Sequence, residues 1–374
     1  MSATLLIDKI NTFWGIKDQH IIDNEFTGYE HLYSTFDKFT KSVYTDDPAG
    51  TIEKVFELYR SVNVVPIIYY TELGLQQAID HFRQSKYKSV NDNIIGLGNN
   101  VGQSINRFIF TNMMTAEPKG RGSNSLRDRF YNDTKLRRAI RICFEFRKGE
   151  KLVYPTALRR ALELVTGENV TNFKAQNARA IVEHLCPIMW GNVYDYSCGY
   201  GGRLLGTSAS KMNYRYVGVD PNTETFEYLQ YLNGLLGNTN QIIHSTSQDY
   251  QPEDIDCAFS SPPYFNLEKY SNEPTQCMVQ FTTLDDWFDS YAVPTMQNIH
   301  RGLNKDGVFA TNIADYKTYG NREFKVVDRW INTANKLGFK YNGIIKLMLN
   351  TRPGVGNDKL VGREKWEGVY VFTK

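Results

Sequence analysis

The sequence predicts an α/β fold over residues 166–374, preceded by a mostly helical part over residues 1–165. In the second part, short β-branched and aromatic runs alternate with amphipathic runs of helical period, and turn residues separate them. Strands separated by helices form a mostly parallel sheet with helices on both faces. A chain of 374 residues is long enough for about two domains, each with its own core.

The elements of the second part follow one another in order. About seven strands are predicted, at 191–197, 214–221, 240–246, 254–261, 307–314, 341–349 and 367–374. The helices between them are predicted at 201–211, 222–237, 283–303 and 325–339. Asn222 or Thr223 can cap the second of these helices and Gly237 can end it, whereas the third carries an internal Pro294.

Composition narrows the class of protein. Charged residues make up 22% and apolar residues 41%, which is typical of a globular chain. We expect no membrane partner, because no run of roughly 18 apolar residues occurs. The start, "MSATLLIDKINTFWG", lacks the pattern of a signal peptide, so a cytoplasmic location is expected. The five scattered cysteines form no CxxC pair and predict free thiols, and no metal site is expected.

The net charge is only +2, but it is unevenly distributed. Residues 119–160 contain 13 Lys and Arg against four Asp and Glu, a local charge of about +9. Such an excess is expected where a polyanion binds. The alternative interpretation is a solvated helix face.

The stretch "VYDYSCGYGGRLLG" (193–206) predicts a strand, a glycine-rich turn and a helix start. Glycines allow positive φ and a close approach of backbone to ligand, and the helix start offers free N–H groups. The stretch lacks the Gly-Lys-Ser/Thr of a phosphate loop, and Leu204 replaces the third glycine of a dinucleotide fingerprint. S-adenosylmethionine, which is cationic and has no phosphate, suits a loop with Asp195 at its strand end.

Two further acids follow this loop. Asp220 ends the next strand, in "YVGVDP", where a carboxylate can accept both ribose hydroxyls of an adenosine. We place Asp249, in "STSQDY", at the end of a third strand, where it can accept from an adenine amino group. Each acid alone could instead cap a helix. Three acids in this order on successive strands favour one crevice for a nucleoside.

The stretch Ser261-Pro262-Pro263-Tyr264 follows the fourth strand, on the same edge of the sheet. Its prolines could simply end the strand. They also remove two N–H donors, which leaves the carbonyls and the Ser261 hydroxyl as acceptors for an exocyclic amine. Acceptance from that amine makes its nitrogen a better nucleophile toward a methyl sulfonium. The Tyr264 ring can stack on a planar base, which must first be flipped out of a duplex.

These motifs resemble the S-adenosylmethionine-dependent DNA amino-methyltransferases. The resemblance covers roughly residues 170–374 and rests on "DYSCGYGG", "GVDP", Asp249 and "SPPY". It implies a Rossmann-like seven-stranded methyltransferase sheet with Ser261, Pro262, Pro263 and Tyr264 at the catalytic position. The helix "NFKAQNARAIVEHL" corresponds to one that reaches the cofactor in that family. The implied cofactor-binding residues are Phe173, Lys174, Asp195, Ser197, Gly199, Gly201, Asp220 and Asp249.

The substrate is less tightly defined. Ser-Pro-Pro resembles the N4-cytosine enzymes and Asp-Pro-Pro the N6-adenine enzymes, so we favour cytosine N4 and leave adenine N6 open. A C5-cytosine enzyme needs Pro-Cys, but the adjacent pair here is Cys186-Pro187. RNA and protein methyltransferases also use Asn-Pro-Pro-Tyr. A silent nucleic-acid-binding module of the same fold is the non-enzymatic alternative.

Ser261 lies only 59 positions after Gly202, which leaves no room between them for a target-recognition segment. We therefore expect residues 1–165 to recognise DNA, through phosphate contacts from the basic stretch. The candidate phosphate-binding residues are Arg121, Arg127, Arg129, Lys135, Arg137 and Arg138.

Overall fold

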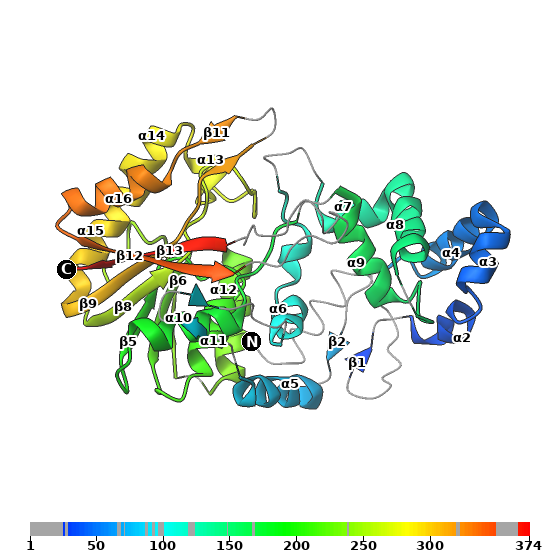
Figure 1. Cartoon of the computed structure of the whole chain (residues 1–374), viewed down its shortest axis with the longest axis horizontal. Helices are drawn as coiled ribbons and strands as arrows, with labels where there is room; N and C mark the ends of the chain where they lie inside the picture. Colours follow the sequence, from blue (N-terminus) through cyan, green and yellow to red (C-terminus); the bar gives the residue numbers. More distant parts are fainter. Residues whose placement is uncertain are drawn as a thin grey trace. The chain divides into compact units, whose positions relative to one another are not determined.

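The chain divides into two compact units, one made of Met1–Ala78 and Arg107–Thr171, the other of Ile79–Asn106 and Asn172–Lys374 (Figure 1). The sequence-based division at residue 165 did not anticipate that segment 79–106 belongs with the second unit. The computed structural model describes residues 25–26, 29–65, 69–70, 72–86, 89–91, 94–95, 101–118, 124–147, 149–166, 169–237, 239–318, 322–348 and 366–374.

The first unit is mostly helical, as predicted. Its helices begin at good capping residues: Asp47 accepts from Gly50 N–H and precedes Pro48, and Ser125 forms a reciprocal capping box with Asp128. Of the strand-like run 63–70, only Tyr69–Tyr70 (β2) is a strand, paired with Glu25–Phe26 (β1), and 66–68 lie outside the described residues. The helices are α2 (Tyr33–Phe36), α3 (Lys41–Asp46), α4 (Pro48–Val62), α7 (Leu126–Tyr131), α8 (Asp133–Phe146) and α9 (Pro155–Thr166).

Two helices, α5 (Glu72–Gln84) and α6 (Gln103–Ile109), contain the points where the chain passes between the units. Within the described residues, every helix is too short or too polar to span a bilayer. All five cysteines are buried free thiols, as their scatter predicts.

The second unit is built on a nine-stranded sheet with the order β3-β4-β12-β13-β9-β8-β5-β6-β7. The predicted seven strands are all present, so the Rossmann-like sheet is confirmed; β3 and β4, from segment 79–106, extend it. The strands β5 to β9 and β12 run parallel, whereas β13 is antiparallel to both neighbours. The strands are β3 (Ser89–Asn91), β4 (Ile94–Ile95), β5 (Asn192–Asp195), β6 (Arg215–Asp220), β7 (Gln241–His244), β8 (Ile255–Ser260), β9 (Leu303–Asn312), β12 (Lys340–Met348) and β13 (Trp366–Thr373).

Alternate residues along the central strands supply two hydrophobic cores, one on each face of the sheet. One core contains Tyr194, Ala258 and Phe309, and the other contains their chain neighbours Val193 and Cys257. Helices η4, α15 and α16 cover the first core, and α10 covers the second. The helices of this unit are α10 (Ala175–Leu185), α11 (Gly202–Ser208), α12 (Thr223–Leu235), α13 (Cys277–Gln280), α14 (Leu284–Trp287), η4 (Phe288–Ala292), α15 (Val293–Gly302) and α16 (Val327–Lys336).

The helix predicted at 283–303 is interrupted. A π-helical turn, η4, separates α14 from α15. Pro294 lies in the first turn of α15, where the missing N–H of proline is least destabilising. The wider π-helical turn before it accommodates the hydrogen bond that proline cannot donate. The start of the earlier helix α12 is as predicted, because Asn222 caps it by accepting from Thr225 N–H at 2.8 Å.

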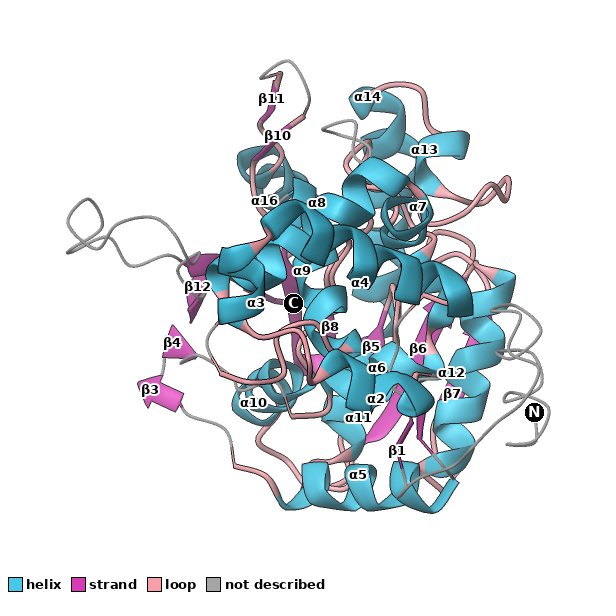
Figure 2. Cartoon of the chain, turned by 90° about the vertical axis from the view of Figure 1, so that its right-hand side faces the viewer, coloured by secondary structure: helices cyan, strands magenta, loops and turns pink. Residues whose placement is uncertain are grey.

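The strand order creates a topological switch point beside β5. From β5 the chain adds β6 and then β7 on one side, and then returns to place β8 on the other side (Figure 2). Because these strands are parallel, their carboxyl ends share one edge of the sheet. The loops after β5 and β8 leave this edge in opposite directions, which is where ligands bind in open α/β sheets. The glycine loop and the Ser-Pro-Pro-Tyr turn therefore flank the switch point.

Candidate active site

The carboxylate of Asp195, at the end of β5, is fully buried and accepts four hydrogen bonds. Its Oδ2 accepts from Arg203 Nε at 2.8 Å and from the Tyr216 hydroxyl at 2.7 Å. Its Oδ1 accepts from the Ser260 hydroxyl at 2.6 Å and from Ser197 N–H at 3.2 Å. These partners come from α11, β6, β8 and the glycine loop. One carboxylate thus joins both motifs across the switch point.

Arg203 is the charge partner of this carboxylate, and the sequence did not reveal it. Its guanidinium is buried, also donates to the Ser197 carbonyl, and lies 5.6 Å from the centre of the Phe173 ring. Burial is the largest influence on Arg203 and lowers its pKa, but Asp195, together with Tyr216 and Cys198, raises the pKa above its usual value. The Asp195 carboxylate thus has an internal charge partner, which the sequence-based prediction of a cationic ligand at this position did not anticipate.

The glycine loop adopts the conformation that its sequence predicts. Gly199 and Gly201 have φ of 54° and 68°, in the left-handed region. A Cβ on Gly202 would lie 2.0 Å from the Phe173 carbonyl oxygen, so this glycine permits close packing against the segment before α10. On Gly199, by contrast, a Cβ would meet no described atom within 4 Å. The loop therefore has one packed side and one open side.

Side-chain amides hold the loop in place. Asn106 Nδ2 and Asn172 Nδ2 both donate to the Tyr200 carbonyl, at 2.7 and 2.9 Å. Phe173 packs edge-on against Phe259 of β8, with ring centres 5.7 Å apart. Lys174 follows at the N-cap position of α10, and partial burial lowers the pKa of its amine.

Asp220 ends β6 on the open side of the glycine loop. Its Oδ2 accepts from Gly199 N–H at 2.8 Å and its Oδ1 from Asn222 N–H at 3.0 Å. Burial raises the pKa of this carboxyl to about 7, although both N–H groups oppose the rise. Each carboxylate oxygen has a second lone pair, so Asp220 can accept further hydrogen bonds from a ligand.

Asp249 does not lie at a strand end, and this prediction is corrected. The outermost strand, β7, ends at His244, and Asp249 lies five residues later on an exposed turn. The polar run after His244 bonds locally instead of extending the strand: Tyr250 N–H donates to the Thr246 carbonyl at 3.1 Å, and the Thr246 hydroxyl donates to Asp249.

The Ser-Pro-Pro-Tyr turn begins directly after Ser260, the β8 member of the Asp195 network. The Tyr264 hydroxyl accepts from Ala314 N–H at 3.0 Å, and Cys277 Sγ lies 3.4 Å from the Tyr264 carbonyl. The Ser261 hydroxyl forms no hydrogen bond with any other part of the chain that the structure describes. The turn is thus held at its tyrosine end and keeps an acceptor unused at its serine end.

Two of the six basic candidates cannot be assigned to a described surface. Arg121 lies outside the described residues. Arg129 is only 1% exposed, and its guanidinium donates to Asn124 O, Leu162 O and Asn169 Oδ1 at 3.0, 3.3 and 2.7 Å. The prediction for Arg129 is therefore wrong, because this side chain ties α7 to the end of α9.

The other four candidates differ in whether their charged groups already contact neighbouring side chains. Arg137 forms a two-pronged bond with Glu53, at 2.6 and 2.9 Å, and lies 3.6 Å from the Phe56 ring centre. Lys135 donates to Asn124, and Arg127 lies over the Tyr131 ring. Arg138 is exposed on α8, and Arg141 lies beside it one turn later.

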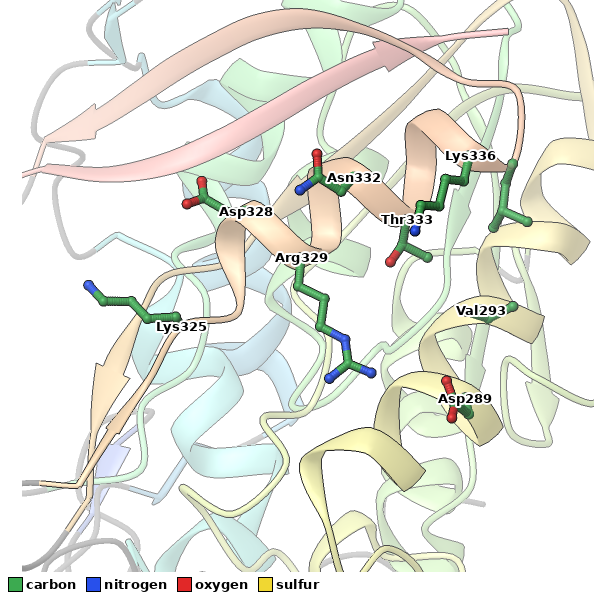
Figure 3. A pocket seen from close by; sticks show the side chains of 9 residues that line it. Asp289, Val293, Lys325, Asp328, Arg329, Asn332, Thr333 and Lys336 are labelled. Carbon is green, nitrogen blue, oxygen red and sulfur yellow. The ribbon is translucent and has the colours of Figure 1, made fainter.

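A separate hollow of about 590 Å³ runs along α16 (Figure 3). Charged side chains dominate its lining, and one of them, Arg329, pairs with Asp285 and lies 4.1 Å from the Phe288 ring centre. None of the predicted site residues lines it. The hollow and the switch-point site are therefore distinct.

No protein-family model matches the chain, and no curated protein sequence matches it. Similar solved structures include a methyltransferase from Pyrococcus furiosus, with 14% identity, coverage of 57% of this chain and 92% of that chain, and a TM-score of 0.35. TrmN from Thermus thermophilus is 13% identical, with coverage of 53% of this chain and 48% of that chain and a TM-score of 0.36. The [4+2]-cyclase SpnF is 12% identical, with coverage of 55% of this chain and 85% of that chain and a TM-score of 0.37. At these TM-scores, the likenesses carry no argument about activity.

We expect Arg203→Met to lower the free energy of unfolding by about 3–5 kcal/mol, because it leaves the Asp195 carboxylate buried without a charge partner. Urea denaturation measures this loss. The double variant Arg203→Met with Asp195→Asn should recover part of it, since the unpaired charge is gone. Arg215→Met, at the exposed start of β6, is the matched control and should change stability by less than about 0.5 kcal/mol. Wild-type stability in Arg203→Met would contradict the role of the pair.

The Asp220 carboxyl should make stability fall as pH rises. Its ordinary pKa is 3.8 and its pKa in the folded protein is about 7, so between these values the folded state holds a proton that the unfolded state has released. Unfolding therefore becomes easier from about pH 4 to pH 7. Relative to Asp220→Asn, which cannot titrate, wild type should lose stability across this range in urea titrations. An equal fall of stability with pH in Asp220→Asn itself would contradict the assignment.

Proposed function

We propose that this chain transfers a methyl group from S-adenosylmethionine to an exocyclic amino group of a base in DNA, with cytosine N4 favoured over adenine N6. The observation that carries the proposal is the hydrogen bond from Ser260 to Asp195, which fixes the glycine loop beside the Ser-Pro-Pro-Tyr turn at the switch point. A loop for a nucleoside cofactor and a turn of unused acceptors then share one crevice.

The residues of the glycine loop fit S-adenosylmethionine. The open side at Gly199 gives room for a ligand close to the backbone, and Asp220 beside it has acceptor capacity for ribose hydroxyls. By the sequence resemblance, Phe173, Lys174, Ser197, Gly201 and Asp249 complete the binding site. Asp195 shapes the loop from within and makes no contact with the ligand in this proposal.

The turn after β8 would activate the amine. When bound, S-adenosylmethionine supplies a methyl group on a sulfonium, and the carbon–sulfur bond breaks with its electron pair left on sulfur. The Ser261 hydroxyl and the Pro262 carbonyl accept the two amine N–H groups and so direct the nitrogen lone pair outward. The nitrogen gains the methyl group and then releases one proton to water.

Tyr264 would bind the base itself. A purine or pyrimidine inside a duplex is stacked on both sides and cannot enter a crevice, so it has to rotate out at a cost of a few kcal/mol. An aromatic face returns part of the lost stacking, roughly 1–3 kcal/mol per base. The hydrogen bond from Ala314 fixes the position of the tyrosine hydroxyl.

The basic face of α8 supports DNA as the substrate. Arg138 and Arg141 are exposed there, and Arg127, Lys135 and Arg137 lie on the same two helices, α7 and α8. Clustered arginines supply the sequence-independent part of nucleic-acid affinity. RNA offers the same phosphates, so the product assay below includes it.

Incubation with S-adenosylmethionine and DNA of mixed sequence, followed by digestion and mass spectrometry of the nucleosides, should yield N4-methylcytosine. Ser261→Ala should lower kcat by roughly tenfold or more, because the amine loses an acceptor worth about 1–3 kcal/mol. Ser290→Ala, on an exposed turn of η4, is the control and should keep full activity. N6-methyladenine would reassign the base, and methylation confined to RNA would reassign the substrate. No methylation of either polymer would refute the proposal.

Reversal of charge on α8 should weaken DNA binding. We expect Arg138→Glu with Arg141→Glu to lower affinity by roughly tenfold at low salt and to reduce the slope of log K against log salt by about 2. Fluorescence anisotropy with labelled duplexes at several salt concentrations measures both. Lys211→Glu with Arg215→Glu, exposed residues at the amino edge of the sheet, is the matched control. Equal losses in both pairs would show that only net charge matters.

A further inference from the structure

A short hairpin after β9 packs against the loop that carries Tyr264. Its strands are β10 (Tyr316–Lys317) and β11 (Glu323–Phe324), and Tyr316 pairs with Phe324 across them. Tyr316 meets the Tyr264 ring edge-to-face, with centres 4.9 Å apart at 75°, and Phe324 contacts Phe265 at 6.0 Å. The two hairpin rings stack on each other at 5.1 Å and 10°. Two aromatic pairs thus dock the hairpin on the turn.

Polar contacts lock the same arrangement. The Tyr316 hydroxyl donates to Asn266 Oδ1 at 2.9 Å, two residues beyond Tyr264. The backbone just before the hairpin contributes Ala314 N–H, which donates to the Tyr264 hydroxyl. Asp315 Oδ1 accepts from Val326 N–H and Val327 N–H at 2.9 and 3.0 Å, which ties the base of the hairpin to the start of α16. The hairpin is therefore anchored to the body of the unit.

This geometry restrains both torsions of the Tyr264 side chain. The Ala314 bond fixes the position of the hydroxyl, and the edge contact with Tyr316 fixes the plane of the ring. An edge-to-face pair contributes about 0.5–1.5 kcal/mol beyond the area that it buries. A free tyrosine ring would lose rotational freedom on stacking against a base, whereas a ring held in advance loses little.

We propose that Tyr316 is a positioning residue, which holds the ring of Tyr264 in the plane needed to stack on the flipped base. The inference rests on the proposed function, since it assigns Tyr264 to the base. It goes beyond that function by placing a determinant of activity on a hairpin that carries no recognised motif. The alternative role is simple core packing, in which Tyr316 stabilises the fold without acting through Tyr264.

The test compares Tyr316→Leu with Tyr316→Phe in steady-state methyl transfer to DNA, with rates referred to the folded fraction. Tyr316→Leu should lower kcat/KM for DNA by roughly 10- to 100-fold, as expected when a reacting group is displaced by about 1 Å. Its KM for S-adenosylmethionine should not change. Tyr316→Phe keeps the ring and loses only the bond to Asn266, so its loss should be about fivefold or less.

A double-mutant cycle with Tyr264→Leu separates positioning from packing. If Tyr316 acts through Tyr264, Tyr316→Leu should cost little further activity in the Tyr264→Leu background. Tyr341→Leu, an aromatic at the amino end of β12 that packs against Phe372, is the matched control and should keep wild-type kinetics. An active wild type with the same Tyr316→Leu loss in both backgrounds would overturn the inference alone. A wild type that methylates no nucleic acid would overturn the proposed function, and this role with it.

Discussion

A single buried carboxylate, that of Asp195, organises the edge of the sheet on which the site depends. A charge removed from water is costly unless a partner and hydrogen bonds replace its hydration. Arg203 supplies the opposite charge, and Tyr216, Ser260 and Ser197 supply the remaining hydrogen bonds. Because an unmade hydrogen bond to a buried carboxylate is costly, these bonds hold the elements that carry the four partners at fixed distances from Asp195. The network therefore links the two motifs beyond the pairing of their strands, β5 and β8, in the sheet.

The strand order gives the network its setting. Because β6 and β8 flank β5, a group at the end of β5 can reach both neighbours, and no other strand end lies between the two motifs. The open side of the glycine loop and the unused Ser261 hydroxyl then remain available, because the packed side and the tyrosine end meet the structural needs. In each loop, therefore, one part is fixed by contacts with the protein and another part is left open to a ligand.

The sequence predicted the strands, the shared edge and the two motifs, since periodicity and turn residues act locally. It did not reveal the direction in which an acid points: Asp195 and Asp220 both end strands, yet only Asp195 has an internal arginine. Basic residues pose the same problem. Arg129 on α7 is buried and Arg138 on α8 is exposed, because their helices turn these side chains toward and away from the rest of the unit. The strands β3 and β4 were missed because they are very short and because β12, the strand that joins them to the sheet through β4, is distant in sequence.

The insertion of segment 79–106 into the second unit has a consequence for the order of folding. Asn106, synthesised early, supports the Tyr200 carbonyl of a loop that is synthesised much later, and Arg83 and Ser85 offer carbonyls to Arg179 on α10. Contacts so distant in sequence require closure of long loops and form slowly. These contacts cannot form until the chain has been synthesised past residue 200, so the support that Asn106 gives to the glycine loop is made only after the loop itself has been synthesised.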